Sequence, residues 1–166
     1  YLKSILFKRL FRRVFCMCYT DLDLLVSKLG GSIYTVDMVE LFPGCPNPRE
    51  DVLATILYNK DNKPIFYINN LIRNKKRVRL CVAMLLSAIK LKKTIDNKFF
   101  ILFSNDDFLL NKELNNNDEI ITLATEIVIP TSLFIELSYL YNDRELAEIF
   151  FVDIKWIKLK YKLISE

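Results

Sequence analysis

The segment RVRLCVAMLLSAIK, residues 77–90, constrains the fold of this chain more than any other. From Leu80 to Ile89 almost every residue is apolar, whereas the residues just before this run are cationic. A helix that is apolar on nearly all sides is a core helix, because every face needs a neighbour to cover it. The pattern therefore predicts a buried central helix over 73–92, with the rest of the domain arranged around it.

The segments around this helix predict a mixed fold. Residues 52–58 and 64–69 are β-rich and flank the polar turn 59–63, which is a hairpin signal, and 33–37 reads as a short strand. The run 99–103 fits either a strand or the start of a helix. Apolar-periodic helical segments follow the Asn-rich stretch 104–118. We therefore expect an α+β fold, mostly helical, with a small antiparallel sheet packed on the central helix.

Two basic segments stand out although the net charge is only +4. Residues 1–19 read as a basic amphipathic helix ahead of the domain, which we place at 20–166. Such a face is usually solvated, but it also suits nucleic acid, and less well a membrane surface. The predicted basic patch joins this helix to the start of the central helix and consists of Lys8, Arg9, Arg12, Arg13, Lys75, Lys76, Arg77 and Arg79.

The composition excludes several kinds of active site. The chain has no histidine, so Ser–His and Cys–His nucleophilic sites and every His-ligated metal centre are excluded. Three glycines are too few for a phosphate-binding loop. The acidic pairs match no metal-binding loop and fit helix capping better. We therefore expect no cofactor and no metal.

Cysteine usage favours a reducing compartment. The four cysteines form no CxxC pair, and Cys81 lies inside the apolar run. No apolar run has the length of a membrane-spanning helix, and residues 1–18 are not arranged as a signal peptide. The expected location is the cytoplasm.

The residue pattern of the C-terminal segment RELAEIFFVDIKWIKLKYKLI predicts a helix–turn–helix arrangement. Its polar residues are almost all lysines, which suits phosphate contact or solvation better than the reading of base edges. We expect these lysines on the outside of the last helix: Lys155, Lys158, Lys160 and Lys162.

Several segments, in order, resemble the ImmA/IrrE family of zinc-peptidase-like proteins from bacteria, phages and mobile elements. The resemblance covers roughly residues 20–164. It rests on DLLVSKLGGSIYTVD, KPIFYINN, KKRVRLCVAMLL, DEIITLATEIVIP and LAEIFFVDIKWIKLKYKLI. It implies a zincin-like domain whose active-site helix is the central helix.

The chain departs from the family where the chemistry should be. The resemblance places Val82 and Leu86 at the two zinc-binding histidines and Ala83 at the general-base glutamate of HExxH. Glu119, with Asp118 as the alternative, matches the third zinc ligand. Val and Leu offer no lone pair and Ala no proton acceptor, so this vestigial site can neither hold zinc nor activate water. The simpler alternative is that 80–89 is a core helix that never carried a site.

The expected function is that of a pseudoenzyme. A catalytically inactive metallopeptidase-like domain would act by binding a partner protein, as a regulator or inhibitor. The resemblance implies a helix–turn–helix repressor or another regulator, in a phage or mobile-element setting. The alternative is a nucleic-acid-associated regulator that uses the basic patch, and an active hydrolase is a third possibility. The expected partner contacts surround the vestigial site: Tyr67, Asn69, Val82, Ala83, Leu86 and Glu119.

Overall fold

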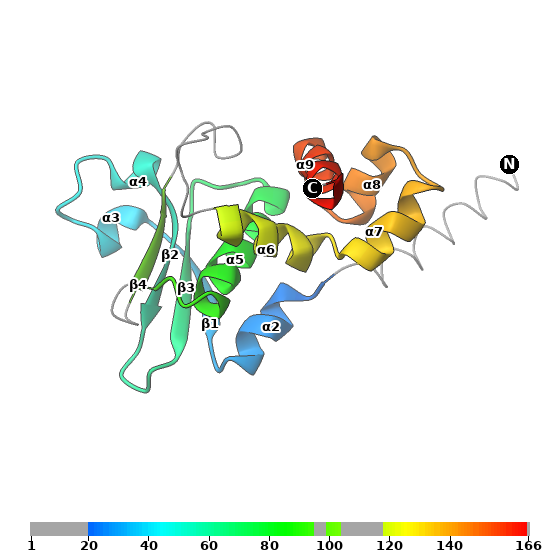
Figure 1. Cartoon of the computed structure of the whole chain (residues 1–166). Coiled ribbons are helices and arrows are strands. Elements are labelled where there is room, and N and C mark those ends of the chain that lie inside the picture. Colours follow the sequence, from blue (N-terminus) through cyan, green and yellow to red (C-terminus); the bar gives the residue numbers. More distant parts are fainter. Residues whose placement is uncertain (1–19, 95–98, 104–117, 166) are drawn as a thin grey trace, which may run out of the picture. The chain divides into compact units, whose positions relative to one another are not determined.

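The computed structural model describes residues 20–94, 99–103 and 118–165. These residues fall into two compact units (Figure 1). We call Asp21–Ala124 the sheet unit, and Thr125–Glu166 with Thr20 the helical unit. The division falls inside one helix, α6. The predicted helix over 1–19, including Lys8, Arg9, Arg12 and Arg13, lies outside the described residues.

The sheet unit contains most of the predicted framework. Its elements are α2 (Leu22–Lys28), β1 (Ser32–Val36), α3 (Met38–Leu41), α4 (Pro48–Asp51), β2 (Val52–Tyr58), β3 (Pro64–Asn69), α5 (Lys75–Lys90), β4 (Phe99–Phe103) and the first part of α6 (Asp118–Val128).

The α+β prediction is confirmed, but the sheet is mixed rather than antiparallel. Its strand order is β1-β3-β2-β4. β2 pairs antiparallel with β3 and with β4, whereas β1 runs parallel to β3, with Tyr34 opposite Tyr67. β1 can be parallel because the chain passes through α3, α4 and β2 before it reaches β3. The run 99–103 is a strand.

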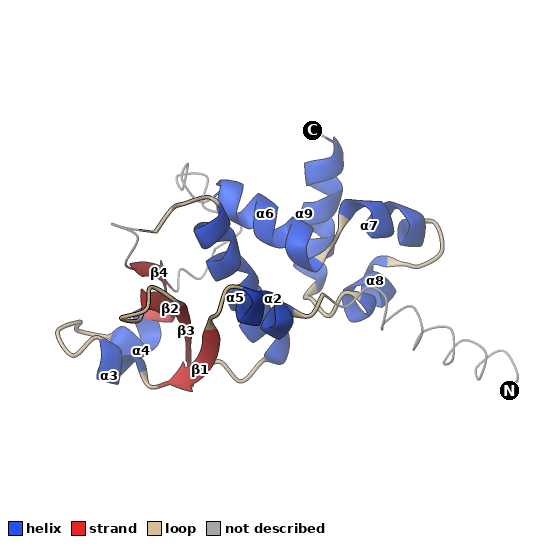
Figure 2. Cartoon of the chain, turned by 90° about the horizontal axis from the view of Figure 1, so that it is seen from below, coloured by secondary structure: helices blue, strands red, loops and turns tan. Residues whose placement is uncertain are grey.

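Alternation along the strands fixes which face of the sheet is buried. Ala54, Ile56, Phe66 and Ile68 are fully buried and lie opposite one another in the β2–β3 register. α5 packs on strands β2, β3 and β4 and also contacts α2 (Figures 1 and 2). The predicted central helix is therefore confirmed, although it is two residues shorter at each end because Asn74 caps it and Leu91 ends it.

The glycine pair after α2 is required by close packing. The side chain of Asp21 accepts a hydrogen bond from the Leu24 amide and begins the helix, and Gly30 adopts a φ of 68° beyond its end. A Cβ on Gly31 would lie 2.6 Å from the carbonyl oxygen of Pro64. Only glycine lets β1 approach β3 this closely.

The helical unit consists of the end of α6, α7 (Thr131–Ser138), α8 (Asp143–Ile149) and α9 (Ile154–Ser165). Pro130 separates α6 from α7. Asn142 begins α8 in a capping box with Glu145. Leu146, Ile149, Phe150 and Ile157 are fully buried and form the core of this unit.

No single helix among the described residues is long and apolar enough to cross a bilayer. α6 and α7 reach the required length and composition only together, and the chain bends by 61° between them.

Candidate functional site

The predicted vestigial site lies in the middle of α5 and is enclosed by the core. Val82, Ala83 and Leu86 are 3%, 0% and 7% exposed. Their helix contacts α2 and three strands of the sheet, so this turn packs inside the sheet unit. Apolar side chains offer no metal ligand and no proton acceptor. What the turn can contribute is packing.

Glu119 lies at the surface, whereas this turn is buried. Its side chain is 65% exposed and forms an ion pair of 3.2 Å with Lys93, three residues beyond the end of α5. The structure therefore gathers Val82, Ala83 and Leu86 on one helix but does not direct the carboxylate of Glu119 toward them. The predicted fourth member of the vestigial site is a surface ion-pair residue.

The side chain of Asn69 forms hydrogen bonds inside the sheet unit and has almost no surface exposed to a partner protein. It is 2% exposed. Its Nδ2 donates to the carbonyls of Arg49 (2.7 Å) and Val52 (2.8 Å), and its Oδ1 accepts from the Leu71 amide at 2.9 Å. These bonds tie the end of β3 to α4 and β2. The polar atoms of Asn69 are therefore used inside the chain, and its role as a partner contact stays a prediction.

Tyr67 lies on the sheet face opposite to the buried side chains of Phe66 and Ile68. It stacks on Tyr34, with ring centroids 6.0 Å apart and an angle of 29° between the rings. α5 covers the other face, so Tyr67 and the turn around Val82 are not parts of one surface. The predicted contact surface is not assembled.

The described part of the predicted basic patch is smaller than expected. Lys75 and Arg77 are exposed and Lys76 is half-buried, but Arg79 is only 5% exposed. Arg79 is turned inward because it lies three and four residues before Val82 and Ala83, on the same buried helix face. The cationic surface at this end of α5 therefore consists of Arg73, Lys75 and Arg77.

Cys81 is an unreactive core residue. Burial raises the pKa of its thiol to about 12, so the thiolate is not populated at neutral pH. Among the described residues no three His, Cys, Asp or Glu side chains come together in a way that could hold a metal ion.

A polar network in the helical unit was not predicted. Lys160 is 2% exposed, and its Nζ donates to Glu126 Oε2 at 2.5 Å and to Thr131 Oγ1 at 2.8 Å. The amide and hydroxyl of Thr131 donate to the same carboxylate. Burial raises the pKa of Glu126, but the hydrogen bonds from Lys160 and Thr131 outweigh it, so the pKa lies below its ordinary value. The expectation that Lys160 lies on the outside of α9 is wrong.

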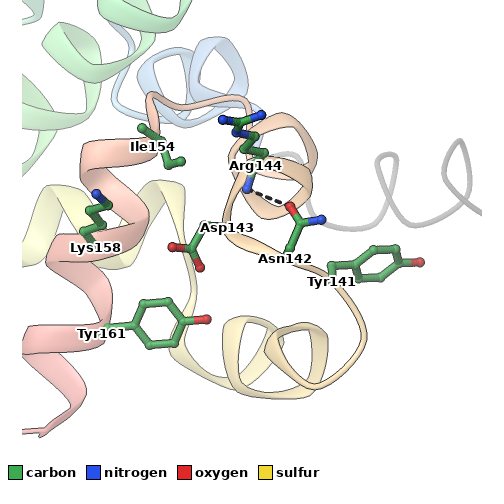
Figure 3. Close-up of a pocket in the computed structure, with 7 residues that line it drawn as sticks. All are labelled: Tyr141, Asn142, Asp143, Arg144, Ile154, Lys158 and Tyr161. Carbon is green, nitrogen blue, oxygen red and sulfur yellow. Dashed lines mark hydrogen bonds between the residues drawn. The ribbon is translucent and has the colours of Figure 1, made fainter.

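The helical unit also carries an open groove of about 600 Å³ between the start of α8 and one face of α9 (Figure 3). The carboxylate of Asp143 lies between the two walls, beside Tyr161 and Lys158. Partial burial and the negative charge of Asp143 raise the pKa of Tyr161. The lining residues are Tyr141, Asn142, Asp143, Arg144, Ile154, Lys158 and Tyr161.

Two large apolar side chains that directly precede the first groove residue in the sequence are exposed. Tyr139 and Leu140, in the turn after α7, are 83% and 74% exposed. Exposed apolar residues next to a groove with charged residues are typical of protein-binding surfaces. We call Tyr139, Leu140 and the groove residues the α7–α8 surface.

No family model, no curated protein and no solved structure matches this chain.

Proposed function

We propose that this chain is a catalytically inactive protein-binding domain that acts as a regulator or inhibitor of a partner protein. The observation that carries the proposal is the packed, apolar middle of α5, where Val82, Ala83 and Leu86 are buried and supply no catalytic chemistry. The similarity of the sequence to the ImmA/IrrE family supports a peptidase-like ancestry for this framework. It also supports a helix–turn–helix repressor or another regulator as the partner.

The α7–α8 surface is the contact surface that we assign to this function. Tyrosine is enriched among the residues that dominate binding energy, and Tyr139 is almost fully exposed. Lys158 and Arg144 at the groove would complement acidic residues of a partner. This assignment replaces the contacts predicted around Asn69 and Val82.

A capture experiment with the native source tests the proposal. The immobilised chain should retain one protein at near-stoichiometric amount, identified by mass spectrometry. The double variant Tyr139→Lys/Leu140→Lys should lose it. Leu71→Lys, at another exposed apolar position, is the matched control and should retain it. Capture that survives the double variant, or that yields no protein at all, would contradict the proposal.

A second candidate function rests on the first turn of α5. This turn contains Lys75, Lys76 and Arg77 and no acidic residue. Cations at a helix N-terminus are repelled by the positive end of the helix dipole, so these residues destabilise the first turn. An anionic partner such as nucleic acid would offset this cost. Binding to DNA or RNA that weakens steeply with salt, and that is lost in Lys75→Glu/Arg77→Glu, would support this function; no binding at low salt would remove it.

A further inference from the structure

The outer edge of β1 has backbone groups that pair with no other strand of the described residues. β1 is the first strand of the sheet and pairs only with β3 among the described strands. The carbonyl of Val36 accepts a hydrogen bond from the Asn70 amide, just beyond β3. Because backbone direction alternates along a strand, Ser32, Tyr34 and Val36 face β3. The N–H and C=O groups of Ile33 and Thr35 therefore face outward.

β1 itself contains no charge, proline or bulge, three features that usually keep a strand edge from pairing. Protected edges carry charges, prolines or bulges. β1 reads SIYTV, without a charge or a proline, and its register with β3 is unbroken. Tyr34, at its centre, is 52% exposed. Isoleucine, tyrosine, threonine and valine are all residues that favour strands. The edge is suited to accept another strand.

The geometry points to a second copy of this chain as that partner, paired antiparallel through β1 about a two-fold axis at Tyr34. In this register Ile33 of one copy faces Thr35 of the other, and these two residues exchange both backbone hydrogen bonds. Tyr34 faces the second Tyr34 in a non-hydrogen-bonded pair, where side chains come closest. The pairing joins two sheets into one and extends the Tyr34–Tyr67 stack across the axis.

The charges at the two ends of β1 are complementary in this arrangement. Exposed Lys28 and Lys63 lie at the end where β1 begins; the Lys63 side chain lies beside Gly30. Exposed Glu40 follows the other end of β1, in α3. Antiparallel pairing brings the basic end of each copy to the acidic end of the other. A parallel pairing would place like charges together, which disfavours it.

The interface is small, so the dimer is a weak one. One five-residue strand pair with a central aromatic contact lies at the low end of specific interface sizes. The test therefore includes a covalent trap that records even a minor dimer population.

Cysteine trapping reads the register directly. In a non-hydrogen-bonded pair the two Cα atoms lie about 4.5 Å apart, within the range that a disulfide spans. Under a mild oxidant Tyr34→Cys should give a disulfide-linked dimer, with residue 34 joined to residue 34 in the digested peptides. Val36→Cys is the matched control: Val36 would face Ser32 of the second copy, so no link between the two cysteines at 36 should form.

Sedimentation of the full chain over a range of concentrations measures the equilibrium. Thr35→Pro removes an outward N–H and leaves the ladder with β3 intact, since proline is tolerated at an edge. We expect it to weaken dimerisation about tenfold or more. Thr35→Ala keeps that N–H and should dimerise like the native chain.

Exchange of the charges at the two ends of β1 is a separate test. Lys28→Glu and Glu40→Lys should each weaken the dimer, and the double exchange should restore it.

Three results would overturn the inference: a monomer at every concentration with no link through residue 34, equal trapping of Tyr34→Cys and Val36→Cys, or a dimer indifferent to Thr35→Pro. All of these measurements use the purified chain alone. They can therefore fail while partner capture through the α7–α8 surface succeeds, and the reverse also holds.

Discussion

Lys160 and Glu126, 34 positions apart in the sequence, join α9 to the end of α6 through a bond of 2.5 Å. The ammonium group is buried, whereas the side chain of Glu126 is 48% exposed. Thr131 completes the network and begins α7 beside them. The packing of the helical unit therefore depends on a lysine whose charge has little access to water.

Removing only the carboxylate should cost more than removing the lysine. Glu126→Gln leaves the buried ammonium of Lys160 without its counter-ion, which should lower the free energy of unfolding by about 2 kcal/mol. Lys160→Met fills the space with an apolar side chain and leaves a carboxylate that water can reach, so its loss should stay below about 1 kcal/mol. Denaturant titration measures both, with Glu136→Gln on the exposed side of α7 as control. Equal losses would show that the buried charge is not the cause.

Stability should depend on Glu126 in acid. The folded-state pKa of Glu126 lies below its ordinary value of 4.5, so in acid the unfolded chain binds the proton more readily than the folded one. The contribution is complete above the ordinary pKa and is lost as the pH falls through the folded-state pKa. The stability difference between the native chain and Glu126→Gln should therefore hold at neutral pH and shrink toward about pH 3. A constant difference over this range would refute the pairing.

Asn69 should be far more sensitive to substitution than its neighbour. Asn69→Ala deprives the carbonyls of Arg49 and Val52 and the amide of Leu71 of their partner in a largely buried place. The expected loss of unfolding free energy is about 2–3 kcal/mol. Asn70→Ala, at the adjacent exposed position, should change it by less than about 0.5 kcal/mol. Similar effects at both positions would mean that the three hydrogen bonds contribute little.

A glutamate should have opposite effects at two positions of α5. Ala83→Glu buries a carboxylate at a fully enclosed position and should destabilise the chain by about 3 kcal/mol or more. Lys75→Glu places the same side chain in the exposed first turn, where the helix dipole favours it, and should stabilise the chain by about 0.5 kcal/mol. Thermal unfolding of the two variants compares them. A tolerated glutamate at 83 would show that this turn opens to water.

Local sequence patterns predicted which segments form helices and strands better than they predicted which strands pair. The apolar run from Leu80 to Ile89 located α5, and the polar turn between two β-rich runs located β2 and β3, all close to their observed bounds. The parallel pairing of β1 with β3 was missed, because it depends on contacts between residues about 33 positions apart, for which a single sequence carries no sign.

The same limit applies to the candidate site. Asn69 stands at a strand end, where an amide could equally face a partner or the chain itself, and its acceptors lie 17 and 20 residues away. Lys160 did carry a signal: it follows buried Trp156 and Ile157 by four and three residues, so helical spacing places it on their face. We placed Lys160 at the surface because of its charge, whereas its helical spacing indicated the interior, where the structure has it.

Titration of purified chain with zinc tests most directly the claim that the middle of α5 serves packing and not catalysis. Calorimetry and elemental analysis would follow binding, and digestion of an unfolded substrate such as casein would follow activity. We expect no stoichiometric zinc and no cleavage, because Val82, Ala83 and Leu86 offer nothing to a metal or a water. One zinc bound per chain, together with turnover of the substrate, would contradict the claim.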